Sequence, residues 1–137
     1  MNTKLAKTQM LLLFLAGTLL VLVATMILGS PNDFYASNSI KLDKNVSLLN
    51  ELKAPAGFLL AAGMFILSAV FVRRRADTAT LLATMIYLSY AASRFVSMLF
   101  DGVPATGLVQ AAALEAVIGL ACLVVLMIRQ LPARQVA

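Results

Sequence analysis

Two ionisable residues interrupt long apolar stretches in the second half of the chain, Arg94 and Glu115. A charged side chain that faces hydrocarbon costs roughly 2.5–3.5 kcal/mol on insertion scales, so both should point toward other helices. At a helical rise of about 1.5 Å per residue, Glu115 lies ~16 Å along its helix from Pro104, and Arg94 lies ~9 Å from Phe100. An arginine side chain spans several ångströms, so the spacing predicts an ion pair between the third and fourth apolar segments.

The segment around Arg94 carries a regular series of polar side chains. They recur every three or four residues, so at about 100° per residue they share one arc of about 140°. The series is Thr80, Thr84, Tyr87, Tyr90, Arg94, Ser97 and Asp101. The other face, with Met85, Leu88, Ala92, Phe95 and Leu99, is expected to meet lipid.

Small residues predict where helices pack closely. Around Glu115 they form the stripe Ala111, Ala112, Gly119 and Cys122, and two further seams are Gly57, Ala61, Met64 and Ser68, and Gly17, Val21 and Ala24. Packing within the chain is one use of these seams. A homodimer through Gly57/Ala61 or through Ala112/Gly119 is the other.

The charged pair has two interpretations. It can be a structural ion pair that fixes helix register, which need not add stability because desolvation opposes the attraction. Alternatively it belongs to a polar pocket that binds a head group, a small polar solute or a proton. The residues of that pocket would be Glu51, Tyr87, Tyr90, Arg94, Asp101 and Glu115. Glu51 and Asp101 each precede an expected helix, where a carboxylate also favours the helix dipole.

Composition excludes several kinds of chemistry. The 137 residues include no histidine, which removes imidazole metal sites and histidine acid–base catalysis, and the single Cys122 cannot form an intramolecular disulfide. We expect no catalytic residue, no metal and no cofactor. The formal net charge of +5 lies at the ends of apolar runs, so it does not indicate nucleic-acid binding.

The chain is 61% hydrophobic, which predicts an integral membrane protein of one domain, residues 1–137. Four apolar segments approach the ~20 residues needed to cross a bilayer, at about 9–28, 55–72, 78–100 and 104–128. We therefore predict an all-α, up-down-up-down bundle of four transmembrane helices. Lys4 and Lys7 before the first segment also suit a signal peptide, but its apolar stretch of ~19 residues exceeds the usual h-region.

Basic residues predict the orientation. One side would carry Lys4, Lys7, Arg73–Arg75, Arg129 and Arg134, and the other Lys41, Lys44 and Lys53 with three acidic residues. The first set should be cytoplasmic, with both termini. The outer loop, about 29–54, would contain a short interfacial helix capped by Asn45, with Leu48, Leu49 and Leu52 facing lipid. Asp101–Pro104 would form a tight outer turn, with Pro104 opening the fourth helix.

Several short motifs resemble a family of bacterial four-helix membrane proteins known as the 4345 domain of unknown function. They are Asn50–Gly57 with Ala62–Gly63, Ser93–Arg94, Asp101–Pro104 and Glu115. The resemblance covers about residues 17–127 and implies the four-helix fold and a bacterial inner membrane. It implies no activity, because none is established for the family.

Three functional classes remain open. The first is a non-enzymatic bundle that binds a membrane lipid or lipophilic ligand, or supports a membrane complex. The second is a small proton-coupled exchanger, although the essential glutamate of small multidrug exchangers lies in the first helix, which here has no charge. The third is a membrane enzyme acting on lipid-like substrates, although the aspartate clusters of such enzymes are absent.

Overall fold

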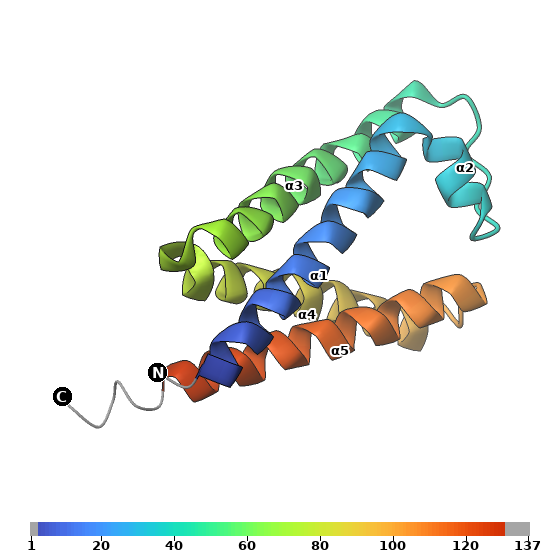
Figure 1. Cartoon of the computed structure of the whole chain (residues 1–137). Helices are drawn as coiled ribbons and strands as arrows, with labels where there is room; N and C mark the ends of the chain where they lie inside the picture. The colour runs from blue at the N-terminus through green and yellow to red at the C-terminus, as the bar shows by residue number, and fades with distance from the viewer. Residues whose placement is uncertain (1–2, 131–137) are drawn as a thin grey trace.

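A computed structural model describes residues 3–130, which fold entirely into helices and connecting loops (Figure 1). Four helices are long: α1 (Thr3–Gly29), α3 (Val46–Phe71), α4 (Ala76–Phe100) and α5 (Thr106–Gln130). Two elements are short: α2 (Pro31–Ala36) and the 3-10 turn η1 (Arg73–Arg75). Each long helix is long and apolar enough to cross a membrane. The structure therefore supports four candidate transmembrane helices.

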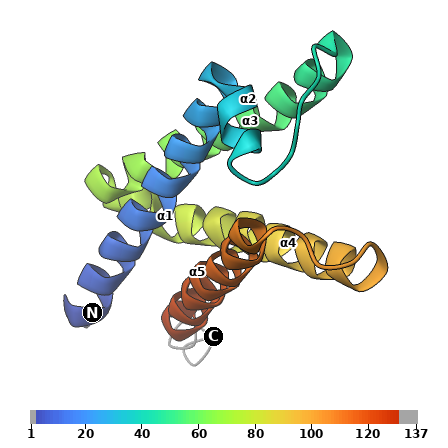
Figure 2. The ribbon, with the colours of Figure 1, turned by 90° about the vertical axis from the view of Figure 1, so that its right-hand side faces the viewer.

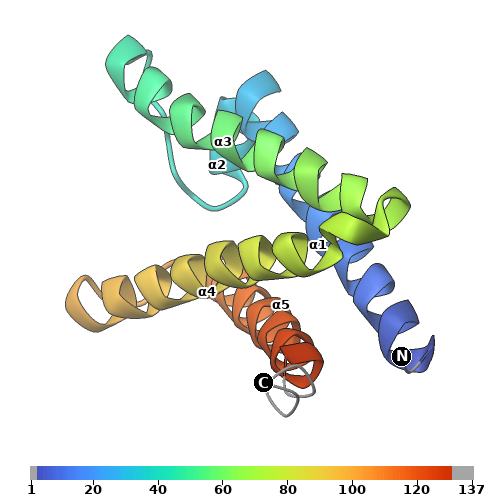
Figure 3. The same cartoon turned by 90° about the vertical axis from the view of Figure 1, so that its left-hand side faces the viewer.

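The long helices pack as two pairs, α1 with α3 and α4 with α5. The N-terminus of α1, η1 and the end of α5 lie at one end of the molecule, which we call the arginine end (Figure 1). The two pairs are close there and diverge toward the other end, where α2 lies between them. Views from the two sides show the same divergence of α3 from α4 (Figures 2 and 3). We call this second, open end the α2 end.

Glycines set the close approach of α1 and α3. A β-carbon at Gly63 would lie 2.9 Å from Val21 and 3.1 Å from the carbonyl of Gly17, and one at Gly17 would meet Leu67 at 2.8 Å. Small residues let two helix backbones approach in a membrane, where dispersion rather than water exclusion drives packing. The buried side chains around this crossing include Leu13, Ala16, Leu20 and Ile66.

A polar network joins three helices at the arginine end. Arg129 of α5 pairs with Asp77 of α4 at 2.6 Å. The side-chain amide of Gln9, on α1, donates to Asp77 at 3.1 Å and to the hydroxyl of Thr80 at 2.9 Å. These bonds tie the first helix pair to the second where the two pairs converge.

The predicted helix boundaries need correction, most of all for the second long helix. It begins at Val46 rather than near Pro55, and Pro55 lies inside it. Asn45 caps it as predicted, because its side chain accepts from the backbone N–H of Leu48 at 3.1 Å. The stretch expected to form a separate interfacial helix is therefore the first part of α3. A proline read as a helix start is here tolerated within a helix, as happens in membrane helices.

The two connections at the α2 end also differ from the prediction. The first contains the helical turn α2, with Pro31 in its first turn. The second ends later than expected, because α5 begins at Thr106 and Pro104 precedes it. Gly102 adopts φ 98°, which favours glycine. Arg134, used in the charge argument, lies outside the described residues.

The predicted packing seam on α3 is wrong, and one residue of the predicted lipid face of α4 is buried against another helix, whereas Met85, Phe95 and Leu99 are exposed as predicted. Gly57, Ala61 and Met64 are exposed on α3, and Gly57 has nothing within 4 Å of an added β-carbon. Leu88, expected to face lipid, packs instead on Gly119 of α5. The Ala112/Gly119 stripe is thus used within the chain, whereas the Gly57/Ala61 face is open to lipid or to a second copy.

Candidate functional site

A cavity of about 470 Å³ lies between the two helix pairs toward the α2 end. We call it the cleft. All four long helices line it, together with α2 and the residues that follow α2. Most of its wall is apolar, including Leu19, Leu20, Val23, Ile27, Phe34, Ile40, Leu52, Leu59, Ile86, Leu108 and Leu114. Such a wall suits a lipophilic molecule.

The predicted ion pair is present on the wall of the cleft. Arg94 Nε donates to Glu115 Oε2 at 2.9 Å, joining α4 to α5. The side chains are 31% and 15% exposed, so both are largely withdrawn from the surface of the bundle. Arg94 has further N–H groups on its guanidinium that make no other hydrogen bond within residues 3–130. The pair is thus internally neutral but retains unused donors.

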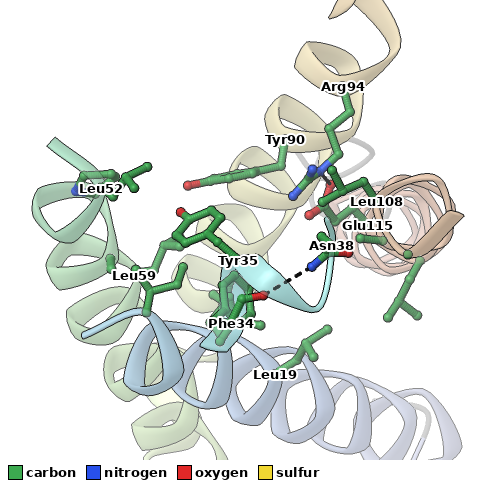
Figure 4. Close-up of a pocket in the computed structure, with 18 of the residues that line it drawn as sticks. Leu19, Phe34, Tyr35, Asn38, Leu52, Leu59, Tyr90, Arg94, Leu108 and Glu115 are labelled. Carbon is green, nitrogen blue, oxygen red and sulfur yellow. Dashed lines mark hydrogen bonds and ion pairs between the residues drawn. The ribbon is translucent and has the colours of Figure 1, made fainter. Parts of the chain in front are cut away.

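Two tyrosines add donors beside the pair. Tyr90 of α4 and Tyr35 of α2 both line the cleft, and in the close-up their hydroxyls point toward α3 (Figure 4). Neither hydroxyl has a hydrogen-bond partner among the described residues. Burial raises the pKa of the Tyr35 phenol, against the opposing positive charge of Arg94. Tyr35 is therefore a neutral donor at physiological pH.

Three further residues of the polar series on α4 already have hydrogen-bond partners. Thr80 and Thr84 each donate to the carbonyl four residues earlier, at 2.7 and 2.8 Å. Tyr87 lines the cleft, but its hydroxyl donates to the carbonyl of Ala16 on α1 at 2.7 Å. The polar face of this helix thus has two parts: one part holds the helices together, and one part, at Tyr90 and Arg94, has donors left over.

The sequence matches the family described as "Domain of unknown function (DUF4345)" over residues 8–126. The chain belongs to the DUF4345 family. This confirms the resemblance noted from the short motifs. No curated protein and no solved structure matches the chain.

In this DUF4345 protein two of the predicted pocket residues lie outside the cleft. Glu51 is exposed, and it lies within α3 rather than before a helix. Asp101 is the C-cap of α4, where it accepts from the hydroxyl of Ser97 at 2.9 Å. Both were expected to precede a helix N-terminus. Glu51 does not, because α3 begins before it, and Asp101 does not, because α5 begins several residues after it. Arg94, Glu115, Tyr87 and Tyr90 do line the cleft.

The DUF4345 cleft also includes residues that sequence reasoning missed. Tyr35 and Asn38 come from the connection read as an outer loop, and they cover the cleft from the α2 end. Asn38 lies against Gly107, where an added β-carbon would be 2.5 Å from its side-chain oxygen. The sequence pair Phe34-Tyr35 could have indicated these cleft residues, because two adjacent aromatic residues in a polar loop favour burial against an apolar wall. Their rings pack edge to face at 5.2 Å.

Among residues 3–130, no three histidine, cysteine, aspartate or glutamate side chains come together. Cys122 is buried between helices and lies outside the cleft. What the cleft offers is an apolar volume with hydrogen-bond donors contributed by α4 and α2.

Proposed function

We propose that this protein is a multi-pass membrane protein whose cleft binds a lipid or lipid-like molecule with an oxygen-bearing polar end. The supporting observation is the juxtaposition of unused donors from Arg94, Tyr90 and Tyr35 with an otherwise apolar wall. Apolar chains of the ligand would lie along the leucines, and its oxygen acceptors would meet the donors. Binding without catalysis is the role proposed.

The charge of the site favours a ligand head with acceptors over one that must carry a full charge. Arg94 is already balanced by Glu115, so an ester or ketone oxygen can accept from the guanidinium and the phenols without leaving a net charge in the membrane. Hydrogen bonds from a charged donor are stronger than those from a neutral one. Arg94 would therefore contribute most to holding the polar end.

A cleft-filling substitution tests the proposal. Ala111 lines the cleft on α5, whereas Ala113, two residues further, is exposed on the same helix. The protein would be extracted in a mild detergent and analysed by native mass spectrometry, at activation energies that strip loosely attached lipid. We expect the wild type and Ala113→Phe to retain a bound molecule and Ala111→Phe to lose it.

Equal retention by both variants would contradict the cleft as the binding site, and so would a wild type that carries no bound molecule. Matching gel-filtration profiles and circular dichroism spectra would show that Ala111→Phe still folds. Tyr35→Phe/Tyr90→Phe then tests the polar end, because it removes two donors without changing the apolar volume. We expect this pair to weaken retention of the same molecule.

A further inference from the structure

A second cavity, of about 250 Å³, lies at the arginine end, away from the cleft. Its wall is formed by α1, η1, the first residue of α4 and the last turn of α5. The lining residues are Ala6, Gln9, Met10, Arg73, Arg74, Ala76 and Arg129. We call it the arginine cavity. None of these residues lines the cleft, so the two sites are independent.

Gln9 has a buried acceptor without a donor. Its side chain is 0% exposed, and its Oε1 is the one buried side-chain polar atom within residues 3–130 that has no hydrogen-bond partner. Leaving such a group unsatisfied costs about 1–3 kcal/mol. Buried polar atoms in folded proteins nearly always have a partner, so this one calls for an explanation.

Turning the amide over does not remove the problem. The Gln9 amide nitrogen donates to a carboxylate oxygen of Asp77 and to the hydroxyl of Thr80. The carboxylate is held ionised by Arg129 and can only accept, and the Thr80 hydroxyl already donates its hydrogen to the carbonyl of Ala76. Both neighbours therefore require the nitrogen of Gln9, and its oxygen is left without a donor. A hydrogen-bond donor is missing from this network.

Two cations beside the same cavity have no anionic partner among residues 3–130. Arg73 and Arg74 are exposed and form no ion pair or hydrogen bond with the described part of the chain. Their neighbours are occupied, since Arg75 donates to Ser68 at 3.1 Å and Arg129 is paired with Asp77. A single water could satisfy Gln9 but would bring no anion to the two exposed guanidinium groups. A ligand with an anionic group and a nearby hydroxyl satisfies all three residues.

We propose that the arginine cavity binds the head group of an anionic phospholipid that carries a free hydroxyl, as phosphatidylglycerol does. The phosphate accepts from the guanidinium groups of Arg73 and Arg74, whose geometry suits phosphate oxygens. A glycerol hydroxyl donates to Gln9 Oε1. The acyl chains lie along the apolar outer surfaces of α1 and α5, which expose Leu11 and Ile128. Charged residues at the end of a membrane helix stand at the height of the lipid head groups.

The test compares lipids of equal charge. Delipidated protein in detergent would be titrated with short-chain phosphatidylglycerol, phosphatidylmethanol and phosphatidylcholine, and bound lipid counted by native mass spectrometry. Phosphatidylmethanol has the same single negative charge but no hydroxyl. We expect affinity for phosphatidylglycerol to exceed that for phosphatidylcholine by about tenfold or more, with phosphatidylmethanol between them. Equal affinity for all three lipids would overturn the proposal.

Variants separate the site from general attraction to a positive surface. Arg73→Gln/Arg74→Gln removes two charges that line the cavity, and Lys7→Gln/Arg75→Gln removes two at the same end that do not. We expect the first pair to reduce phosphatidylglycerol affinity about tenfold and the second less than about twofold. All four positions are exposed, so neither variant should disturb the core. Equal losses would contradict a defined site.

Gln9→Met tests the hydroxyl contact itself. It should abolish the preference for phosphatidylglycerol over phosphatidylmethanol while leaving the preference for both over phosphatidylcholine. An unchanged preference in a folded Gln9→Met protein would refute the assignment of the hydroxyl to Gln9.

Free glycerol phosphate serves as the last probe. If it binds as tightly as the lipid, the ligand is a soluble phosphate and the lipid proposal is wrong.

Discussion

At the scale of single residues, the Arg94–Glu115 pair both joins two helices and lines the cleft. The contact joins α4 to α5 at 2.9 Å and leaves the outer N–H groups of the guanidinium toward the cleft. One hydrogen bond fixes the side chain, and the remaining donors are then presented in a defined direction. The two interpretations drawn from the sequence are therefore compatible, because the bond that fixes the helices also positions the donors.

A double-mutant cycle measures the structural part. Glu115→Gln leaves the Arg94 charge without its partner in a poorly hydrated place, so we expect a loss of about 1.5–3 kcal/mol in the free energy of unfolding. Arg94→Gln/Glu115→Gln removes both charges and should recover much of that loss, since the cost comes mainly from the unpaired charge. Thermal or denaturant unfolding in detergent gives the values. Arg94→Gln alone completes the cycle, and losses of the two single variants that simply add in the double variant would show that the pair is not coupled.

The same variants separate stability from binding. If the pair only fixes register, the double variant retains the cleft ligand as well as the wild type does. If Arg94 holds the polar end of that ligand, the double variant is folded and stable yet loses it. The native mass spectrometry proposed for the cleft makes this comparison directly.

At the scale of elements, hydropathy predicted the four long helices because length and apolar composition are local properties of the sequence. The Arg94–Glu115 pair was also predictable, since charges within apolar segments have few acceptable partners. The start of α3 was not, because Pro55 reads as a boundary and the polar residues before it read as loop. The capping signal of Asn45 was correct, but the helix it starts continues through the proline.

Which small residues face a neighbouring helix was harder to predict than the helices themselves. Both Gly57 and Gly63 lie on α3, and the sequence favoured the seam through Gly57. The structure instead places Gly63 against Gly17 and leaves Gly57 exposed. Apolar helices carry no hydrophobic contrast between a lipid face and a protein face, so rotation about the helix axis is weakly encoded. The cleft residues of α2 were missed because their position depends on both helix pairs.

Alanine at the two glycines of α3 tests this packing. Gly63→Ala places a methyl group 3.1 Å from a backbone oxygen of α1, which cannot move without moving the helix. We expect it to lower the free energy of unfolding by about 1–3 kcal/mol. Gly57→Ala has open space and should be neutral or slightly stabilising, because alanine favours helix more than glycine. A comparable loss at Gly57 would indicate that this face packs against a second copy.

At the scale of the whole molecule, the two ends differ in chemistry. The arginine end is closed by the network of Gln9, Asp77 and Arg129, whereas the α2 end is open between the helix pairs and covered by α2. A molecule tied at one end and divergent at the other can admit an elongated ligand while keeping its helices together. Asp77→Asn would weaken this polar network and test whether the closed arginine end is needed to keep the helices together around such a ligand.

The distribution of basic residues between the two ends also predicts the orientation of the protein in a membrane. The structure brings Lys4, Lys7, Arg73–Arg75 and Arg129 to the arginine end, while Lys41 and Lys44 lie in the connection after α2. The positive-inside rule predicts that the arginine end is cytoplasmic and that the cleft opens outward. Cysteine labelling in intact cells tests this orientation, with Cys122→Ala as the background. A thiol reagent that cannot cross the membrane should label the Lys44→Cys variant at once and the Arg75→Cys variant only after permeabilisation. The reverse pattern would invert the orientation, and labelling of both variants in intact cells would mean that α3, the long helix between them, does not span the membrane.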